Sequence, residues 1–269
     1  MDKLVFVSIL GMGGIGLFFA CVLAAANSRL AVKENPKIEE IENALPKVNC
    51  GACGFLNCHE YAVALAEGGQ PINACKPGGE EVEKQLADIL GVKAEAMVKK
   101  IAVVHCAANR TIRKKKAEYK GIKTCTAKNM LKGGDVLCDY GCLGLGDCAL
   151  ACPFDAIKME DGLPLVDPVK CVACGKCILA CPRGIISLEE VGDCEIIYVA
   201  CSSRDKGPAT RKICPVGCIA CGICQKISAG VFQVKNNLAT LDYEKIKIVE
   251  KKDEIMLKCP TKVIKKINI

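Results

Sequence analysis

The longest apolar stretch lies near the start of the chain and runs for 23 residues, from Leu4 to Ala26, without a charged side chain. A helix of that length spans the apolar layer of a bilayer. Basic residues are in excess after it, at Arg29, Lys33 and Lys37, which predicts that the following domains lie on the cytoplasmic side of the cell membrane. A cleaved signal peptide is the alternative, but its apolar region would be shorter and its basic leader stronger.

Beyond this span, the apolar positions predict short elements separated by polar segments. Residues 28–40 are polar and contain a proline, as is typical of a linker. Apolar side chains near helical spacing predict one or two helices over residues 80–101. Two cysteine-dense stretches, 138–190 and 194–269, resemble each other as internal repeats do. The mixture of helices and short strands predicts an α+β fold.

Cysteine sets the composition apart, at 22 of 269 residues, whereas there are 2 histidines and no tryptophan. Two histidines cannot support an extensive zinc or copper chemistry based on imidazole. Because thiols stay reduced in the cytoplasm, disulfides are disfavoured, and the cysteines are predicted to bind metal ions or iron–sulfur clusters. Such inorganic centres would supply much of the stability of a chain with few aromatic residues.

The most specific motif is Cys171-x2-Cys174-x2-Cys177-x3-Cys181-Pro182, the pattern of a bacterial 4Fe–4S ferredoxin. The first three thiolates of such a run bind one cluster, and the fourth, just before proline, binds the neighbouring cluster. Zinc sites do not require a pair of Cys-Pro sequences arranged in this way.

A second run lies upstream and ends in Cys148-x3-Cys152-Pro153, with Leu145 where a middle cysteine would stand. Cys138 lies a little earlier and is expected to supply the missing thiolate through a longer loop. The expected ligand sets are Cys138, Cys142, Cys148 and Cys181 for one cluster, and Cys171, Cys174, Cys177 and Cys152 for the other.

The C-terminal repeat contains one complete ligand set and lacks the other. Random loss would rarely remove all four ligands of one cluster and none of the second, which predicts a ferredoxin module that kept a single 4Fe–4S cluster. A vestigial module without a cluster is the alternative. The thiols present are Cys218, Cys221, Cys224 and Cys259, and the replaced positions are Ser228, Val249, Lys252 and Ile255.

Four more cysteines precede the ferredoxin runs, at Cys50, Cys53, Cys58 and Cys75. Nearby glycines let the backbone approach a cluster and donate amide hydrogen bonds to its sulfur atoms. The pattern favours a 4Fe–4S cluster, although the same four thiolates would also suit a zinc ion. His59 is expected at the surface or beside the cluster rather than as a ligand, because four thiolates suffice.

Six cysteines remain outside these sets. Cys106 and Cys201 follow similar apolar segments, and Cys125 and Cys214 each precede a ferredoxin run. These four would either hold an extra cluster that bridges the repeats or be buried structural thiols. The sequence therefore predicts four 4Fe–4S clusters, and five if the bridging set binds one. The cysteines without an assigned ligand role are Cys21, in the apolar span, and Cys194.

The segment from 110 to 123 contains seven basic residues and one acidic residue. Nucleic acid is not an expected partner, because neither stacking aromatic residues nor a known binding module accompanies the charge. A small acidic electron carrier fits such a surface, and a solvated or membrane-facing surface is the alternative. No G-x-G-x-x-G lies between a strand and a helix, so this chain is not expected to bind NAD or flavin. The basic residues are Arg110, Arg113, Lys114, Lys115, Lys116, Lys120 and Lys123.

Several motifs resemble those of the B subunit of the Rnf complex, in the same order and over nearly the whole chain. They are the apolar span, NCGACGFLNCHEYA, INACKPGG, CDYGCLGLGDCALACPFDAI and CVACGKCILACPRGII. The resemblance implies a membrane complex that oxidises reduced ferredoxin, reduces NAD and translocates Na+ or H+. It implies that this iron–sulfur subunit accepts the electrons of ferredoxin and relays them to membrane and flavin- or NADH-binding subunits, without a catalytic site of its own.

A membrane-anchored polyferredoxin that serves a hydrogenase or a formate or CO dehydrogenase is the alternative, but it would lack the N-terminal four-cysteine domain. A zinc-bearing scaffold without a redox role is a third hypothesis. One helix without charged side chains offers no ion path, so translocation is expected in other subunits. The expected domains are a membrane anchor (1–27), a linker (28–40), a four-cysteine domain (41–79), a helical and basic connecting segment (80–130), a two-cluster ferredoxin module (131–190) and a one-cluster ferredoxin module (191–269).

Overall fold

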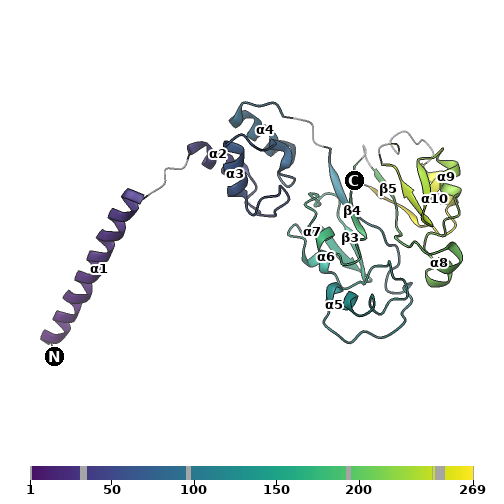
Figure 1. Cartoon of the computed structure of the whole chain (residues 1–269), viewed down its shortest axis with the longest axis horizontal. Helices are drawn as coiled ribbons and strands as arrows, with labels where there is room; N and C mark the ends of the chain where they lie inside the picture. Colours follow the sequence, from purple (N-terminus) through teal and green to yellow (C-terminus); the bar gives the residue numbers. More distant parts are fainter. Residues whose placement is uncertain are drawn as a thin grey trace.

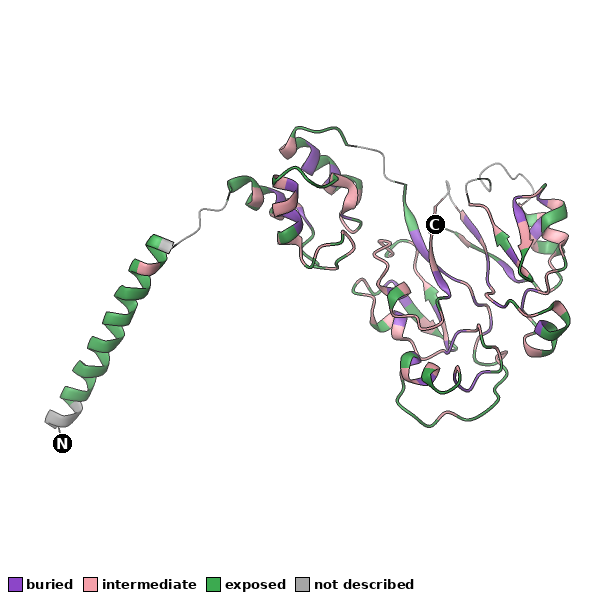
Figure 2. Cartoon of the chain, in the orientation of Figure 1, coloured by how far each residue is buried: buried purple, intermediate pink, exposed green. Residues whose placement is uncertain are grey.

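The computed structural model describes residues 2–30, 35–94, 98–191, 195–243, 245 and 252–268 (Figure 1). Its first element is the long helix α1, Asp2–Leu30. Among the described residues, the segment Phe6–Arg29 of this helix is long and apolar enough to cross a membrane, with a mean hydropathy of 2.3. Its side chains are exposed along nearly the whole length, as they must be in a helix that faces lipid rather than a protein core (Figure 2).

The N-terminal domain is a small helical unit around a core of Ile41, Tyr61, Leu65 and Leu86. The linker predicted at 28–40 differs from the structure, because the helix α2 begins within it, where Asn35 caps the first turn. The structure also places the last helix in this domain, because Leu86 is buried in its core, rather than in a connecting segment. The elements are α2 (Pro36–Ala44), α3 (Cys58–Ala66), the 3₁₀ helix η1 (Ile72–Ala74) and α4 (Gly79–Leu90).

The first ferredoxin module begins earlier than the predicted residue 131, because its first strand precedes the basic segment 110–123. This strand, β1, pairs antiparallel with the last strand, β4, and Val104 lies opposite Ile186. A short hairpin and three helical turns lie between the two strands. The elements are β1 (Lys100–Val104), α5 (Cys125–Met130), α6 (Asp147–Leu150), β2 (Ile157–Glu160), β3 (Leu163–Val166), α7 (Lys176–Leu179) and β4 (Ile186–Glu190).

The second ferredoxin module repeats this plan, which confirms the internal repeat seen in the sequence. Its first and last strands pair antiparallel, with Val199 opposite Ile264, and a hairpin lies between them. The elements are β5 (Glu195–Val199), α8 (Gly207–Ile213), α9 (Ile223–Ile227), β6 (Phe232–Lys235), β7 (Leu238–Leu241), α10 (Lys252–Lys258) and β8 (Ile264–Asn268).

The two ferredoxin modules pack through their first strands. Ile101 and Val103 of β1 form a buried cluster with Ile196 of β5, visible as the purple segments of these strands in Figure 2. His105 joins the modules by hydrogen bonds, because its Nδ1 lies 2.8 Å from the Val199 carbonyl oxygen and its Nε2 lies 2.7 Å from the Ser187 hydroxyl. The cysteines that follow β1 and β5 are therefore held at one interface.

Candidate iron–sulfur cluster sites

The N-terminal domain brings its four cysteines together at the start of α3. The backbone N–H of Cys58 donates to the Asn49 side chain at 2.8 Å, which fixes the loop before the helix. Burial raises the pKa of Cys75 to about 11, and the neighbouring sulfur atoms of the other three cysteines add to this shift. His59 lies 2.8 Å from Glu42. The group that the structure assembles is Cys50, Cys53, Cys58 and Cys75.

The three ferredoxin runs share a loop conformation that requires small residues. Ala173 and Gly175 have positive φ angles of 56° and 78°, and the equivalent Ala220 and Gly222 have 53° and 74°. Such angles strain residues other than glycine. In the upstream run, Gly144 and Gly146 adopt the same left-handed pattern around Leu145, with φ angles of 76° and 87°. That run is therefore a ferredoxin loop in which leucine occupies the place of a ligand.

The first complete run gathers the set that its spacing predicts. Burial raises the pKa of Cys177 to about 11, and the next largest contributions come from Cys171, Cys174 and Cys152. The backbone N–H of Ala102 in β1 donates to the Cys171 sulfur at 3.4 Å. Amide donors of this kind tune the potential of a cluster. Cys152, the cysteine before Pro153, thus lies with the downstream run, as the two-cluster arrangement requires.

The upstream run lines a cavity of about 370 Å³ with three of its predicted ligands, but the fourth cysteine in this cavity is Cys125. Cys138, predicted for this position, lines a different cavity. The carboxylate of Asp147 in α6 accepts the Cys125 backbone N–H at 2.7 Å and the Thr126 N–H at 3.1 Å, so it ties the start of α5 to the run. The cysteines around this cavity are Cys125, Cys142, Cys148 and Cys181.

The C-terminal module gathers its four predicted thiols around a cavity of about 360 Å³. The place of the missing second set is filled by protein core. Phe232 and Ile255 are fully buried there, and the Ser228 hydroxyl accepts the Phe232 backbone N–H at 2.9 Å. Lys252 pairs with Glu195 at 3.5 Å, and Val249 lies outside the described residues. The cavity is lined by Cys218, Cys221, Cys224 and Cys259.

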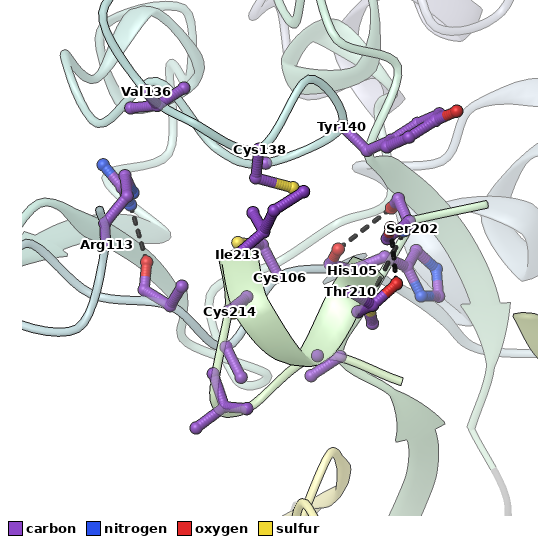
Figure 3. Close-up of a pocket in the computed structure, with 18 of the residues that line it drawn as sticks. His105, Cys106, Arg113, Val136, Cys138, Tyr140, Ser202, Thr210, Ile213 and Cys214 are labelled. Carbon is purple, nitrogen blue, oxygen red and sulfur yellow. Dashed lines mark hydrogen bonds between the residues drawn. The ribbon is translucent and has the colours of Figure 1, made fainter. Parts of the chain in front are cut away.

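A further cavity of about 560 Å³ lies between the two ferredoxin modules, and four cysteines line it. Figure 3 shows Cys106, Cys138 and Cys214 around this space. The bridging set that the sequence offered as one alternative contained Cys125, whereas Cys138 lines this cavity in its place. Of the cysteines left over, Cys21 is exposed on α1, and Cys194 lies outside the described residues. The cysteines of this bridging cavity are Cys106, Cys138, Cys201 and Cys214.

The thiols and their surroundings fit clusters better than single metal ions. In the described part of the chain, no group of three or more His, Cys, Asp or Glu side chains is close enough to hold one ion. Ligands of a cluster stand farther apart, because each binds a different iron atom. The buried Nε atoms of Arg113 and Arg183 find no hydrogen-bond partner among the described residues, and each arginine lines one of these cavities. An anionic cluster would accept such donors.

Two family models match segments of the chain that contain such cysteine groups. The family model described as "Putative Fe-S cluster" matches residues 45–77, and the model described as "4Fe-4S binding domain" matches residues 164–187. Both matches fall on cysteine groups that the structure assembles.

Three relatives are similar over most of the chain, and each is the B subunit of a membrane complex. That of the proton-translocating ferredoxin:NAD(+) oxidoreductase complex of Clostridium ljungdahlii is 42% identical over 94% of this chain and 89% of its own length. That of the ion-translocating oxidoreductase complex of Methanosarcina acetivorans is 39% identical over 91% of this chain and 93% of its own length. That of the Na(+)-translocating ferredoxin:NAD(+) oxidoreductase complex of Acetobacterium woodii is 41% identical over 94% of this chain and 75% of its own length. The chain therefore belongs to the family of B subunits of the ion-translocating Rnf oxidoreductase complexes.

Proposed function

We propose that this chain is the electron-relay subunit of a ferredoxin:NAD oxidoreductase, anchored in the membrane by α1. Electrons from reduced ferredoxin pass one at a time through its 4Fe–4S clusters to partner subunits that reduce NAD and translocate Na+ or H+. The observation that carries the proposal is the gathering of the cysteines into groups of four. Membership of the Rnf B-subunit family favours this function over that of a polyferredoxin serving a hydrogenase or dehydrogenase.

We propose four cluster sites, and we assign Cys125 rather than Cys138 to the upstream ferredoxin site because Cys125 lines the same cavity as Cys142, Cys148 and Cys181. Cysteine thiols that burial keeps protonated must lose their protons when iron binds, so assembly of each cluster releases protons and stabilises the fold. The proposed ligand sets are Cys50, Cys53, Cys58 and Cys75 (N site), Cys152, Cys171, Cys174 and Cys177 (F2 site), Cys125, Cys142, Cys148 and Cys181 (F1 site), and Cys218, Cys221, Cys224 and Cys259 (C site).

The N, F2 and F1 sites form a continuous path toward the anchored end of the chain. Burial raises the pKa of Cys174 in the F2 site, and the Cys50 sulfur of the N site is among the next causes, so the two sites are neighbours. The F1 and F2 sites exchange ligands, because Cys152 and Cys181 each serve the run that they do not belong to. Electrons that reach F1 can therefore continue to the N-terminal domain without a long gap.

The distribution of charge supports an acidic protein such as ferredoxin as the electron donor. Residues 191–269 contain 14 basic residues (Lys and Arg) and 8 acidic residues (Asp and Glu). Residues 35–99, by contrast, contain 6 basic and 10 acidic residues. The basic segment 110–123 adds to the positive side, because Lys114 Nζ donates to the Lys212 carbonyl oxygen at 2.7 Å. Opposite charges on donor and acceptor speed their encounter. The basic residues after α1 favour a cytoplasmic position for these domains, where ferredoxin is available.

The test is reduction of the clusters by ferredoxin in the full-length protein, purified anaerobically in detergent. We expect the visible absorption of oxidised clusters to bleach on mixing with reduced ferredoxin, and NAD reduction to follow when the remaining subunits are present. A chain that dithionite bleaches but that reduced ferredoxin leaves oxidised would contradict the proposed donor. A chain that is colourless and contains zinc in place of iron would contradict the electron relay itself.

A further inference from the structure

We infer that Cys106, Cys138, Cys201 and Cys214 hold a fifth 4Fe–4S cluster that joins the two ferredoxin modules. The site uses two cysteines from each module, and all four line the bridging cavity. Figure 3 shows three of them, Cys106, Cys138 and Cys214. Its ligand set differs from the bridging set suggested by the sequence, which contained Cys125. The role of this cluster rests on the proposed electron relay, whereas its existence does not.

The four side chains are presented by equivalent segments of the two modules, with the N–H of Gly141 bonded to the Cys138 carbonyl oxygen and that of Gly217 bonded to the Cys214 carbonyl oxygen. Cys106 follows β1 and Cys201 follows β5, so the packing of these two strands brings the pair to one interface. Cys214 directly follows α8, and its N–H donates to the Thr210 carbonyl oxygen at 2.8 Å. Cys138 lies in the loop before the upstream run, where its carbonyl oxygen accepts the Gly141 N–H at 3.3 Å. Each thiol is thus held by its own module and placed by their contact.

The bridging cavity resembles the F1 and C sites in its lining, because each is bounded by four cysteine side chains and by mostly apolar surface. Arg113 lines it and is held by bonds to the carbonyl oxygens of Ala108 and Gly162, yet its buried Nε has no partner among the described residues. The F1 cavity has the same feature at Arg183. An anionic iron–sulfur cluster would compensate both half-buried cations.

The sulfur atoms also have the amide donors that clusters require. Burial raises the pKa of Cys201 to about 11, against the opposing effect of backbone N–H groups of Cys218 and Ser203. The Ser203 N–H lies 3.4 Å from this sulfur. Burial likewise raises the pKa of Cys138, and the N–H groups of Tyr140 and Gly141 oppose the shift. Hydrogen bonds to sulfur stabilise the thiolate and set the potential of a bound cluster.

The position of this fifth cluster completes the relay. The Cys218 backbone N–H that contacts Cys201 belongs to a ligand of the C site. On the other side, burial raises the pKa of Cys142 in the F1 site to about 11, and the Cys106 sulfur is the next largest cause. The bridging cluster therefore lies between the C and F1 sites. It gives the C site a neighbouring cluster on the path to the N-terminal domain.

Iron and acid-labile sulfide in the full-length protein, reconstituted anaerobically, test the count. We expect about 20 iron atoms per chain for five clusters, whereas four clusters give about 16. Cys106→Ala and Cys138→Ala should each lose about four iron atoms per chain. The double variant should lose no more iron than either single variant, because the two substitutions remove the same cluster. Cys21→Ala, outside every proposed site, is the matched control and should keep the full content.

Pairs of substitutions decide the ligand set even if single variants are less stable. Cys138→Ala combined with Cys142→Ala should cost about eight iron atoms, because the two residues serve different clusters. A loss of about four from that pair would place Cys138 in the F1 site and overturn the proposal, as would about 16 iron atoms in the unmodified chain. Failure of the proposed function has a different signature: full iron content without reduction by ferredoxin.

Discussion

Asp147 is predicted to hold the F1 cluster through Cys125, although it binds no iron itself. Its carboxylate accepts the N–H groups of Cys125 and Thr126 and the Thr126 hydroxyl, at 2.7, 3.1 and 3.2 Å. Burial opposes ionisation, but these hydrogen bonds together lower the pKa of Asp147, so the carboxylate is charged at neutral pH. Asp147→Ala removes all three bonds and leaves the first two amides of α5 without their acceptor.

The size of the effect follows from these contacts. A hydrogen bond to a charged group contributes about 1.5–3 kcal/mol, and loss of a helix cap costs about 1 kcal/mol. The three bonds share one carboxylate and are not additive, so we expect a cost of about 2–4 kcal/mol. This corresponds to a roughly 30-fold to several-hundred-fold shift toward released Cys125. The remaining ligands then hold a cluster that is open to chelators.

The assay follows iron release from the reconstituted full-length protein to a ferrous chelator, together with total iron. Asp147→Ala should release about four iron atoms per chain much faster than the unmodified protein does. Asp139→Ala is the matched control, since Asp139 is largely exposed and contacts Lys116 at 3.4 Å. Equal release from Asp147→Ala and Asp139→Ala would refute the positioning role of Asp147 and with it the placement of Cys125.

Three further outcomes are expected. Ile255 is buried in the core of the C-terminal module, so Ile255→Ala should destabilise that module by about 2–5 kcal/mol and lower its melting temperature. The iron content should stay unchanged, and a loss of iron would contradict this expectation. Lys114→Glu with Lys212→Glu should slow reduction by ferredoxin about tenfold or more at low ionic strength, whereas Lys158→Glu with Lys170→Glu should not, and stopped-flow absorption compares the pairs. Tyr61→Phe should cost about 1 kcal/mol in the N-terminal domain, because the hydroxyl donates to the Pro71 carbonyl oxygen at 2.8 Å, and calorimetry detects the change.

The packing of the C-terminal module explains why its second cluster could be lost. Phe232 and Ile255 fill the space, and the Ser228 hydroxyl satisfies a backbone donor where a thiolate would stand. A buried cluster and a buried apolar core both exclude water, so either can support the same hairpin and helices. The sequence showed which ligands were missing, but it could not show that a hydrophobic core had replaced them.

Several features were predictable because they depend on contacts close along the chain. The ferredoxin runs place three thiols on one loop, and the spacing alone predicts that they meet. A helix within residues 80–101 also follows from a local apolar pattern, and α4 confirms it, although Lys100 and Ile101 belong to the strand β1 instead. The linker boundary was wrong because the amphipathic helix α2, with Ile41 on its buried face, is too short to give a clear periodic signal.

The sequence by itself determined that this chain has an apolar anchor, repeated ferredoxin runs and more cysteines than four clusters need. The proposed division of Cys125 and Cys138 between the F1 and bridging sites rests on the tertiary structure alone. Sequence distance favoured Cys138 for F1, because it lies four residues before Cys142. The carboxylate of Asp147 holds Cys125 against F1 instead, and the packing of β1 on β5 leaves Cys138 facing the second module. Both contacts join residues far apart in the chain, and no local pattern encodes them.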